Sequence, residues 1–123
     1  METETRPTIW IINEAGHPYH RALDLISDAE LKPLTLGDIN PLRTDRLNYH
    51  LAEGIGKYGK VEDYLLISGT PMVNAMAVLL WTLRFGEARI LQWNAMRSKR
   101  CYELTTVVKE DLEHLLESFM LPK

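Results

Sequence analysis

A polar turn at residues 68–70 has the composition expected of an anion-binding site. It follows the apolar run 64–67 and precedes Pro71 and a long apolar segment. Glycine lets a backbone approach a ligand closely, and the first turn of a helix offers unpaired N–H groups and positive dipole charge. The lysine of a P-loop and the G-x-S-x-G pattern of a nucleophile elbow are both absent. The sequence therefore predicts a cradle for phosphate, with ligand contacts from Ser68, Gly69, Thr70 and Asn74.

His17 is the residue whose chemistry could go beyond binding. It lies in the turn 13–18, directly after the β-branched run 8–12. A neutral imidazole at the end of a strand can accept or donate a proton near neutral pH. We therefore take His17 as the candidate general acid or base. The alternative is a histidine that only caps its own loop.

Polar or small residues also follow the other predicted strands. In open α/β sheets, ligands bind at the carboxyl ends of the strands, near the point where the strand order reverses. Loops are commonly polar, so this pattern has an ordinary explanation as well. The helix start after the glycine turn favours a real ligand site. The further candidate ligand contacts are Asn13 and Gly16 after the first strand, Asp38 after the second and Asn94 after the fourth.

The other histidines and the single cysteine give no pattern typical of a metal site. A zinc site needs three or four ligands at defined spacing, and we expect neither a metal nor a cofactor. One cysteine excludes a disulfide within the chain, and the first residues carry no signal-peptide pattern, so we expect a cytoplasmic protein. The scattered residues are His20, His50, Cys101 and His114.

Three glycines in residues 54–59 spell the dinucleotide fingerprint G-x-G-x-x-G. That fingerprint must follow a strand and open a helix, whereas here it ends a predicted helix and precedes a strand. We therefore interpret it as a helix exit. The basic residues 97–100 are interpreted as a hairpin tip, and whether they contact a ligand is left open.

The elements that position these residues alternate between strand and helix. Such alternation predicts a single α/β domain over residues 1–123, three-layered and Rossmann-like, with a mostly parallel sheet of about five strands. The sheet is expected to end in an antiparallel C-terminal hairpin, followed by an amphipathic helix. The predicted strands are 8–12, 34–36, 64–67, 88–94 and 101–106. The predicted helices are 18–28, 44–55, 71–85 and 109–120.

The helix 71–85 has strong local boundary signals and an unusual surface. Thr70 is placed to cap it through its hydroxyl, Pro71 suits the first position, and Gly86 suits a left-handed end. The helix is apolar on nearly all sides but too short and too interrupted to span a membrane. An all-round apolar helix is expected to be covered twice, so we predict a homodimer. The net charge of −3 disfavours a partner that is a long nucleic acid.

The chain resembles the CARF-like Rossmann proteins of type III CRISPR systems, especially the small ring-nuclease or sponge accessory proteins. The resemblance rests on short motifs in order: Asn13 to Gly16-His17-Pro18, Ser68-Gly-Thr-Pro71 leading into residues 74–80, Phe85-Gly86, and the strand 90–93. It implies a homodimer that binds a cyclic oligoadenylate across its two-fold axis and sequesters or degrades it.

Degradation would then proceed without metal, by attack of a ribose 2′-OH with His17 as proton acceptor. The resemblance gives phosphate contacts to Gly69, Thr70 and Asn74, and ribose or adenine contacts to Asn13, Asp38 and Asn94. Two alternatives stay open: a noncatalytic interaction or adaptor protein that uses helix 71–85 as its interface, or a binder or enzyme for a mononucleotide or sugar phosphate.

Overall fold

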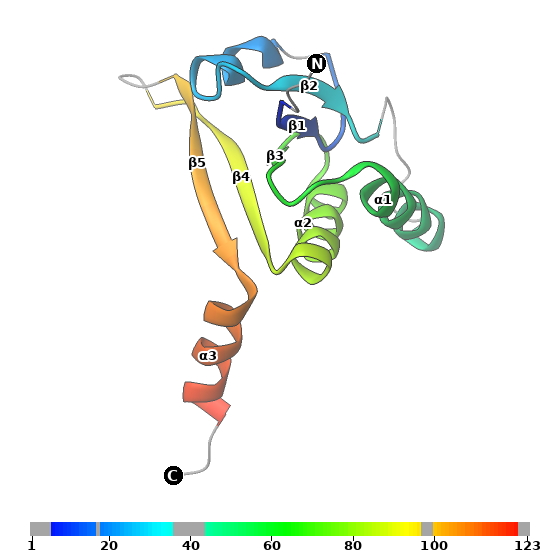
Figure 1. Ribbon diagram of the computed structural model, residues 1–123, viewed down its shortest axis with the longest axis vertical. Helices are drawn as coiled ribbons and strands as arrows, with labels where there is room; N and C mark the ends of the chain where they lie inside the picture. The colour runs from blue at the N-terminus through cyan, green and yellow to red at the C-terminus, as the bar shows by residue number, and fades with distance from the viewer. Residues whose placement is uncertain (1–5, 17, 36–43, 97–99, 121–123) are drawn as a thin grey trace, which may run out of the picture.

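The computed structural model describes residues 6–16, 18–35, 44–96 and 100–120, arranged around a five-stranded sheet (Figure 1). Within them the chain forms, in order, β1 (Thr8–Ile11), η1 (Tyr19–Asp24), β2 (Glu30–Pro33), α1 (Thr44–Tyr58), β3 (Tyr64–Leu66), α2 (Pro71–Phe85), β4 (Glu87–Asn94), β5 (Cys101–Val108) and α3 (Lys109–Met120).

The strand order in the sheet is β2-β1-β3-β4-β5. β1 runs parallel to both β2 and β3, β3 runs parallel to β4, and β5 pairs antiparallel with β4. The chain moves outward from β1 to β2 and then returns to place β3 on the other side of β1. The predicted fold class, with its antiparallel hairpin and terminal helix, is thereby confirmed, and the strand order reverses between β1 and β3.

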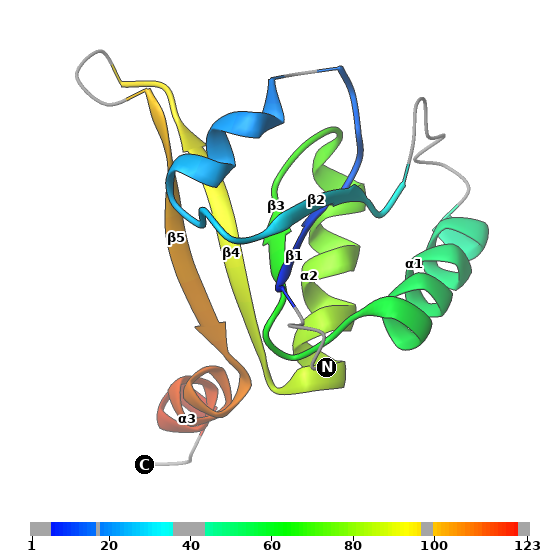
Figure 2. The same ribbon diagram turned by 45° about the horizontal axis from the view of Figure 1, so that its top comes forward.

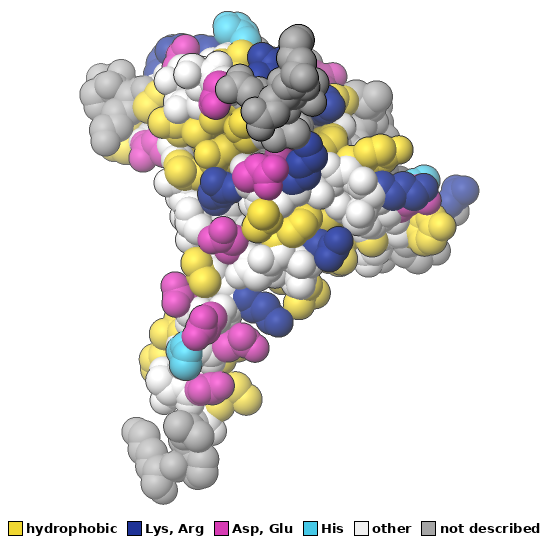
Figure 3. Space-filling model, in the orientation of Figure 1, with side chains coloured by type: hydrophobic (Ala, Val, Ile, Leu, Met, Phe, Trp, Pro, Cys, Tyr) yellow, Lys and Arg dark blue, Asp and Glu magenta, His cyan; other side chains and the backbone are white. Residues whose placement is uncertain are grey.

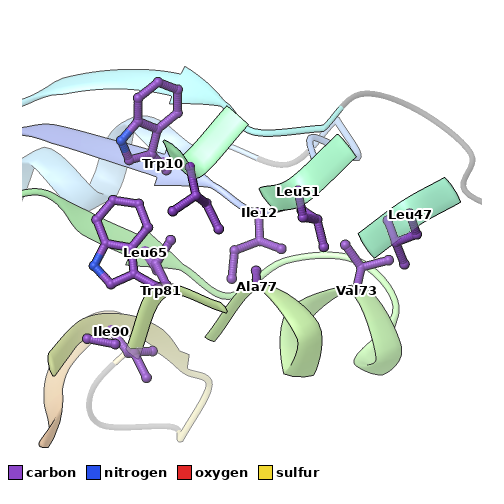
Figure 4. Close-up of a cluster of buried hydrophobic side chains, with 11 residues drawn as sticks. Trp10, Ile12, Leu47, Leu51, Leu65, Val73, Ala77, Trp81 and Ile90 are labelled. Carbon is purple, nitrogen blue, oxygen red and sulfur yellow. The ribbon is translucent and has the colours of Figure 1, made fainter. Parts of the chain in front are cut away.

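Two apolar clusters cover the two faces of the sheet because the strands alternate their side chains between faces. On one face, Trp10, Ile12 and Leu65 pack against α1 and α2 (Figure 4). On the other face, Ile9, Ile11 and Leu66 pack with Tyr19 and other residues of η1 and β5. Figure 2 shows α1 and α2 together on one side and η1 across the sheet.

The start of β1 is fastened by Asp63, which the sequence analysis did not single out. Its side chain is 1% exposed. One carboxylate oxygen accepts the Thr8 N–H at 2.9 Å, and the other accepts the Trp10 indole N–H and the Lys60 N–H, each at 3.0 Å. A buried carboxylate is tolerated where several donors satisfy it. Asp63 therefore ties the beginnings of β1 and β3 together.

The second strand was predicted in the wrong place, and the first helix in the wrong form. β2 is Glu30–Pro33 instead of 34–36, and η1 is a six-residue 3₁₀ helix instead of a longer helix. β2 is an edge strand whose pairing is set by its parallel register with β1, Thr8 opposite Glu30. That constraint is non-local, so the apolar pattern around Leu34 does not reveal it.

α1 continues past the glycines that were expected to end it. Gly54 and Gly56 lie inside the helix, which ends at Tyr58. Each interior glycine costs about 1 kcal/mol relative to alanine. Ile55, between them, is 2% exposed and belongs to the core beneath α1. Burial of this side chain offsets the cost, so tertiary packing decides the helix end.

α3 lies where the sequence predicted it, but it extends away from the body (Figures 1 and 2). All of its residues are exposed, and it has no buried member. The Lys109 N–H donates to the Gly86 carbonyl oxygen at 2.9 Å, which ties the start of α3 to the end of α2. Figure 3 shows hydrophobic side chains beside acidic ones on this projection.

Candidate functional site

The β3–α2 turn, Ser68 to Thr70, is closed by the side-chain amide of Asn74. The amide oxygen accepts the Ser68 N–H at 2.9 Å, and the amide nitrogen donates to the Ser68 and Thr70 carbonyl oxygens at 2.9 and 2.7 Å. Asn74 is 7% exposed. The amide therefore replaces backbone partners that the turn cannot supply, and Asn74 has a structural role. Contact between Asn74 and a ligand stays a prediction.

Gly69 occupies a position that only glycine fits. Its φ is +87°, in the left-handed region, where other residues are strained. A Cβ there would lie 2.6 Å from the Asn13 amide nitrogen and 2.7 Å from the Asn13 Cβ. The turn after β3 therefore packs directly on the residue that ends the β1 segment.

Thr70 precedes α2 as expected, but its hydroxyl does not cap the helix. The residue has extended backbone angles and makes no side-chain cap hydrogen bond. Its Oγ1 is shielded from solvent and has no hydrogen-bond partner. The predicted hydroxyl cap is therefore wrong, although Thr70 does occupy the cap position before α2. At the other end Gly86, with φ +84°, is the predicted left-handed cap.

Asn13 joins the same group of residues from the end of β1. It is 5% exposed, and its amide oxygen accepts the Thr35 hydroxyl at 3.0 Å. The structure thus brings Asn13 together with Ser68, Gly69 and Thr70 at the carboxyl end of the parallel strands, next to the strand-order switch. The side chain of Asn13 is itself buried in contacts that hold the loops together.

The other predicted contacts are dispersed. Gly16 lies in the loop before η1, and its N–H donates to the Glu14 carboxylate at 3.0 Å. Asn94 bonds Glu103 across the hairpin and lines a separate cavity of about 290 Å³. β4 runs three residues past Leu91, which pairs with Leu66 at the end of β3, so Asn94 lies beyond the site. His17 and Asp38 lie outside the described residues.

A cavity of about 370 Å³ opens beside the β3–α2 turn, and sequence reasoning missed its aromatic wall. The wall includes Trp93 and Tyr102, whose rings meet edge-on with centroids 5.1 Å apart. These two residues pair across the β4–β5 hairpin. An aromatic pair flanking a hairpin tip was the signal that could have found it. The lining residues are Pro18, Tyr19, Ile67, Ser68, Gly69, Trp93 and Tyr102.

One side of this cavity is polar, whereas the wall formed by Trp93 and Tyr102 is aromatic. The Tyr19 and Ser68 hydroxyls are 2.6 Å apart, and the Ala15 N–H donates to the Tyr19 oxygen at 2.8 Å. Burial, and to a smaller degree the neighbouring Tyr19, raises the pKa of Tyr102 above its ordinary value. Tyr102 therefore stays neutral at physiological pH and keeps its hydroxyl proton.

Two further findings concern the described part of the chain. No group of three His, Cys, Asp or Glu side chains there is placed to hold a metal ion. Among the same residues, no helix combines the length and hydropathy needed to cross a bilayer.

Comparison with protein families adds one match. Residues 7–108 fit the model of a family described as phage Pam3 gp32-like protein. The chain belongs to this family. The match extends from the residue before β1 to the last residue of β5. No curated protein and no solved structure matches the chain.

The family match corrects the resemblance drawn from short motifs. The chain is assigned to a phage protein family and not to the CARF-like or CRISPR-associated proteins. A glycine-containing turn such as Ser68-Gly-Thr-Pro71 recurs in many unrelated α/β proteins where a parallel strand leads into a helix, so it identifies a fold element better than a family. Binding of a cyclic oligoadenylate was implied by that resemblance, and the family match does not test it.

Proposed function

We propose that this protein is a noncatalytic structural subunit that assembles with further copies of itself, each copy placing α3 on α2 of its neighbour. The observation that carries the proposal is the exposed apolar side of α3.

The apolar side of α3 has the spacing of a helix face made for packing. Its members are 46–83% exposed and follow the i, i+3, i+4, i+7 pattern of a buried stripe. Contiguous apolar patches of this kind are uncommon on monomeric proteins and mark interaction sites. We call this set the α3 stripe: Leu112 (46%), Leu115 (57%), Leu116 (61%) and Phe119 (83%).

α2 offers an exposed apolar stripe that is longer than the α3 stripe. Met72, Leu79 and Leu83 are 44%, 57% and 67% exposed, and they extend over about 16 Å of helix. The α3 stripe extends over about 10 Å, so it fits within the α2 stripe. We therefore propose α2 as the interface helix, in line with its apolar composition.

Charge favours pairing of α3 with α2 over pairing of two α3 helices. α3 carries four carboxylates and one lysine, whereas the one charged residue of α2 is Arg84. Two α3 helices side by side would carry eight carboxylates between them, with Asp111 and Glu113 flanking the stripe of each helix, and like charges near one another are destabilising. An α3–α2 contact avoids that repulsion and gives the acids one cation.

Such a contact is heterologous, because two different surfaces of the chain meet. Heterologous contacts propagate into rings or filaments instead of stopping at a dimer. Complete burial of four fully exposed apolar side chains would contribute roughly 6–12 kcal/mol. The α3 stripe is 46–83% exposed, so its burial contributes less, against a cost of association of about 4–15 kcal/mol. One contact alone is thus expected to be weak, and a closed ring would gain from having no free ends.

The test is sedimentation velocity of the full chain over a range of concentrations. Leu115→Glu places a charge in the α3 stripe, and His114→Glu places a carboxylate on the opposite side of the helix. We expect the wild type and His114→Glu to form species larger than the 14.2 kDa monomer and Leu115→Glu to stay monomeric. A monomeric wild type at high micromolar concentration, or equal association by Leu115→Glu, contradicts the proposal.

A further inference from the structure

We propose that the cavity between η1, the β3–α2 turn and the β4–β5 hairpin binds a neutral, planar heteroaromatic compound of about the size of a nucleobase. The inference is independent of self-assembly, because the cavity lies at the carboxyl end of the strands and α3 starts at the opposite end of α2 (Figures 1 and 2).

The shape of the cavity favours a flat ring. Trp93 and Tyr102 form a continuous aromatic wall, with their ring planes inclined at 67°. Trp93 is 40% exposed, whereas Trp10 and Trp81 are buried in the core. An exposed indole at the mouth of a pocket presents a stacking surface to a ligand. An aromatic surface of this kind stacks with aromatic rings better than it packs against branched chains.

The polar side of the cavity can orient a ligand through hydrogen bonds, without a charged group. The Asn74 amide bonds both the N–H and the carbonyl oxygen of Ser68. The hydroxyl is therefore the polar group that Ser68 presents at the cavity. Either hydroxyl of the Ser68–Tyr19 pair can be the donor. The pair can therefore match a ring nitrogen, which accepts, or an exocyclic amine, which donates.

The described lining residues offer a phosphate inside the cavity no opposite charge. None of them is ionisable except the two tyrosines. Arg21 lies 5.6 Å from the centroid of the Trp93 ring, and its guanidinium pairs with Asp24 at 3.8 Å. A dianion in the cavity would lose its water while this cation stays engaged by Asp24, at a high cost. A neutral ligand avoids this cost.

The volume limits the size of the ligand. About 370 Å³ is near the lower end of the range of roughly 300–1,000 Å³ found for small-molecule sites. One bicyclic ring system fits, with a small substituent at the mouth. A longer nucleotide or a cyclic oligonucleotide does not fit inside, and such a molecule could place only a single base there.

The experiment is a titration with adenine, followed in ¹H–¹⁵N correlation spectra of the full chain. Expected are saturable shifts at residues 67–69, 93 and 102, with a dissociation constant of about 1 mM or tighter. Cyclohexanol, which has a ring and a hydroxyl but no aromatic face, is expected to give no saturable shifts. Adenosine monophosphate is expected to bind more weakly than adenine.

Three variants locate the binding. Trp93→Ala removes the exposed part of the wall and should abolish saturation, and Tyr58→Ala, which removes a 64% exposed aromatic ring from α1, should leave it unchanged. Ser68→Ala should weaken binding about three- to tenfold by loss of one hydrogen bond. No saturable shift with adenine, equal binding of cyclohexanol, or unchanged binding by Trp93→Ala overturns the proposal. Because Trp93 is partly exposed, this variant is expected to fold.

Discussion

The side-chain amide of Asn74 bonds both the N–H and the carbonyl oxygen of Ser68, at 2.9 Å each. This pair converts the end of β3 into the start of α2 without a backbone hydrogen bond at Ser68. Asn74, which the sequence suggested as a phosphate contact, thus holds the turn together. Its removal is expected to lower the stability of the fold, whether or not it changes ligand binding.

Asn74→Asp tests this role. A carboxylate still accepts the Ser68 N–H but cannot donate to the Ser68 and Thr70 carbonyl oxygens, which it would then face at close range. Each unsatisfied buried group costs about 1–3 kcal/mol, partly offset by the favourable position of an anion near a helix start. We expect a lower free energy of unfolding in urea for both Asn74→Asp and Asn74→Ala. Equal midpoints for wild type and variants would show that these hydrogen bonds are dispensable.

Gly69 and Gly86 form a matched pair for testing how tightly the turn is packed. Both have positive φ, +87° and +84°, but a Cβ would meet Asn13 at Gly69 and nothing within 4 Å at Gly86. Gly86→Ala is expected to cost roughly 1–2 kcal/mol for the left-handed backbone alone. Gly69→Ala should cost more, because Asn13 must also move. Thermal unfolding ranks the two, and an equal loss would mean that the contact with Asn13 relaxes freely.

Asp63→Asn should destabilise the fold by about 2–3 kcal/mol. The substitution leaves one acceptor where three N–H donors converge, and it turns an NH₂ group toward at least one of them. Asp28→Asn, at an exposed position, serves as the control and should change stability little. Denaturant unfolding that gives the same free energy for both variants would contradict the role of Asp63 as an anchor.

Tyr102 gives the stability a pH dependence in the alkaline range. Its pKa in the folded chain is raised by burial, so above the ordinary tyrosine value of about 10 the unfolded chain loses this proton first. Stability is therefore complete below about pH 10 and falls as the pH rises through the folded pKa. The difference between wild type and Tyr102→Phe isolates this effect from other groups. A parallel decline of both proteins above pH 10 would show that Tyr102 does not contribute.

The sequence predicted local elements well and long-range placement less well. The bounds of α2 follow from Pro71 and Gly86, which act within the helix itself, and the structure confirms them. β2 was misplaced because an edge strand is positioned by its register with β1. The α3 pattern predicted an amphipathic helix, but no local pattern says which surface covers it.

In the candidate site, too, some features could be predicted from the order of the elements and others depend on long-range contacts. Asn13 and the turn 68–70 meet because parallel strands end at one edge of the sheet, a rule that needs only the order of elements. Asn94 lies away from the site because β4 is longer than β3 and extends past its end. The aromatic cavity depends on the hairpin register that pairs Trp93 with Tyr102 and on the position of Tyr19. None of these is visible in the periodicity of a single segment.

The contact between α3 and α2 of a neighbouring copy is tested most directly by cross-linking two single-cysteine variants. Both carry Cys101→Ser; one adds Leu116→Cys in α3 and the other Leu79→Cys in α2. Mixed under mild oxidation, they are expected to form a covalent dimer that neither forms alone. Leu116→Cys mixed with Tyr49→Cys, an exposed position on α1, is the control and should not cross-link. No dimer from the first mixture, or equal cross-linking by Leu116→Cys alone, would contradict the assembly that we propose.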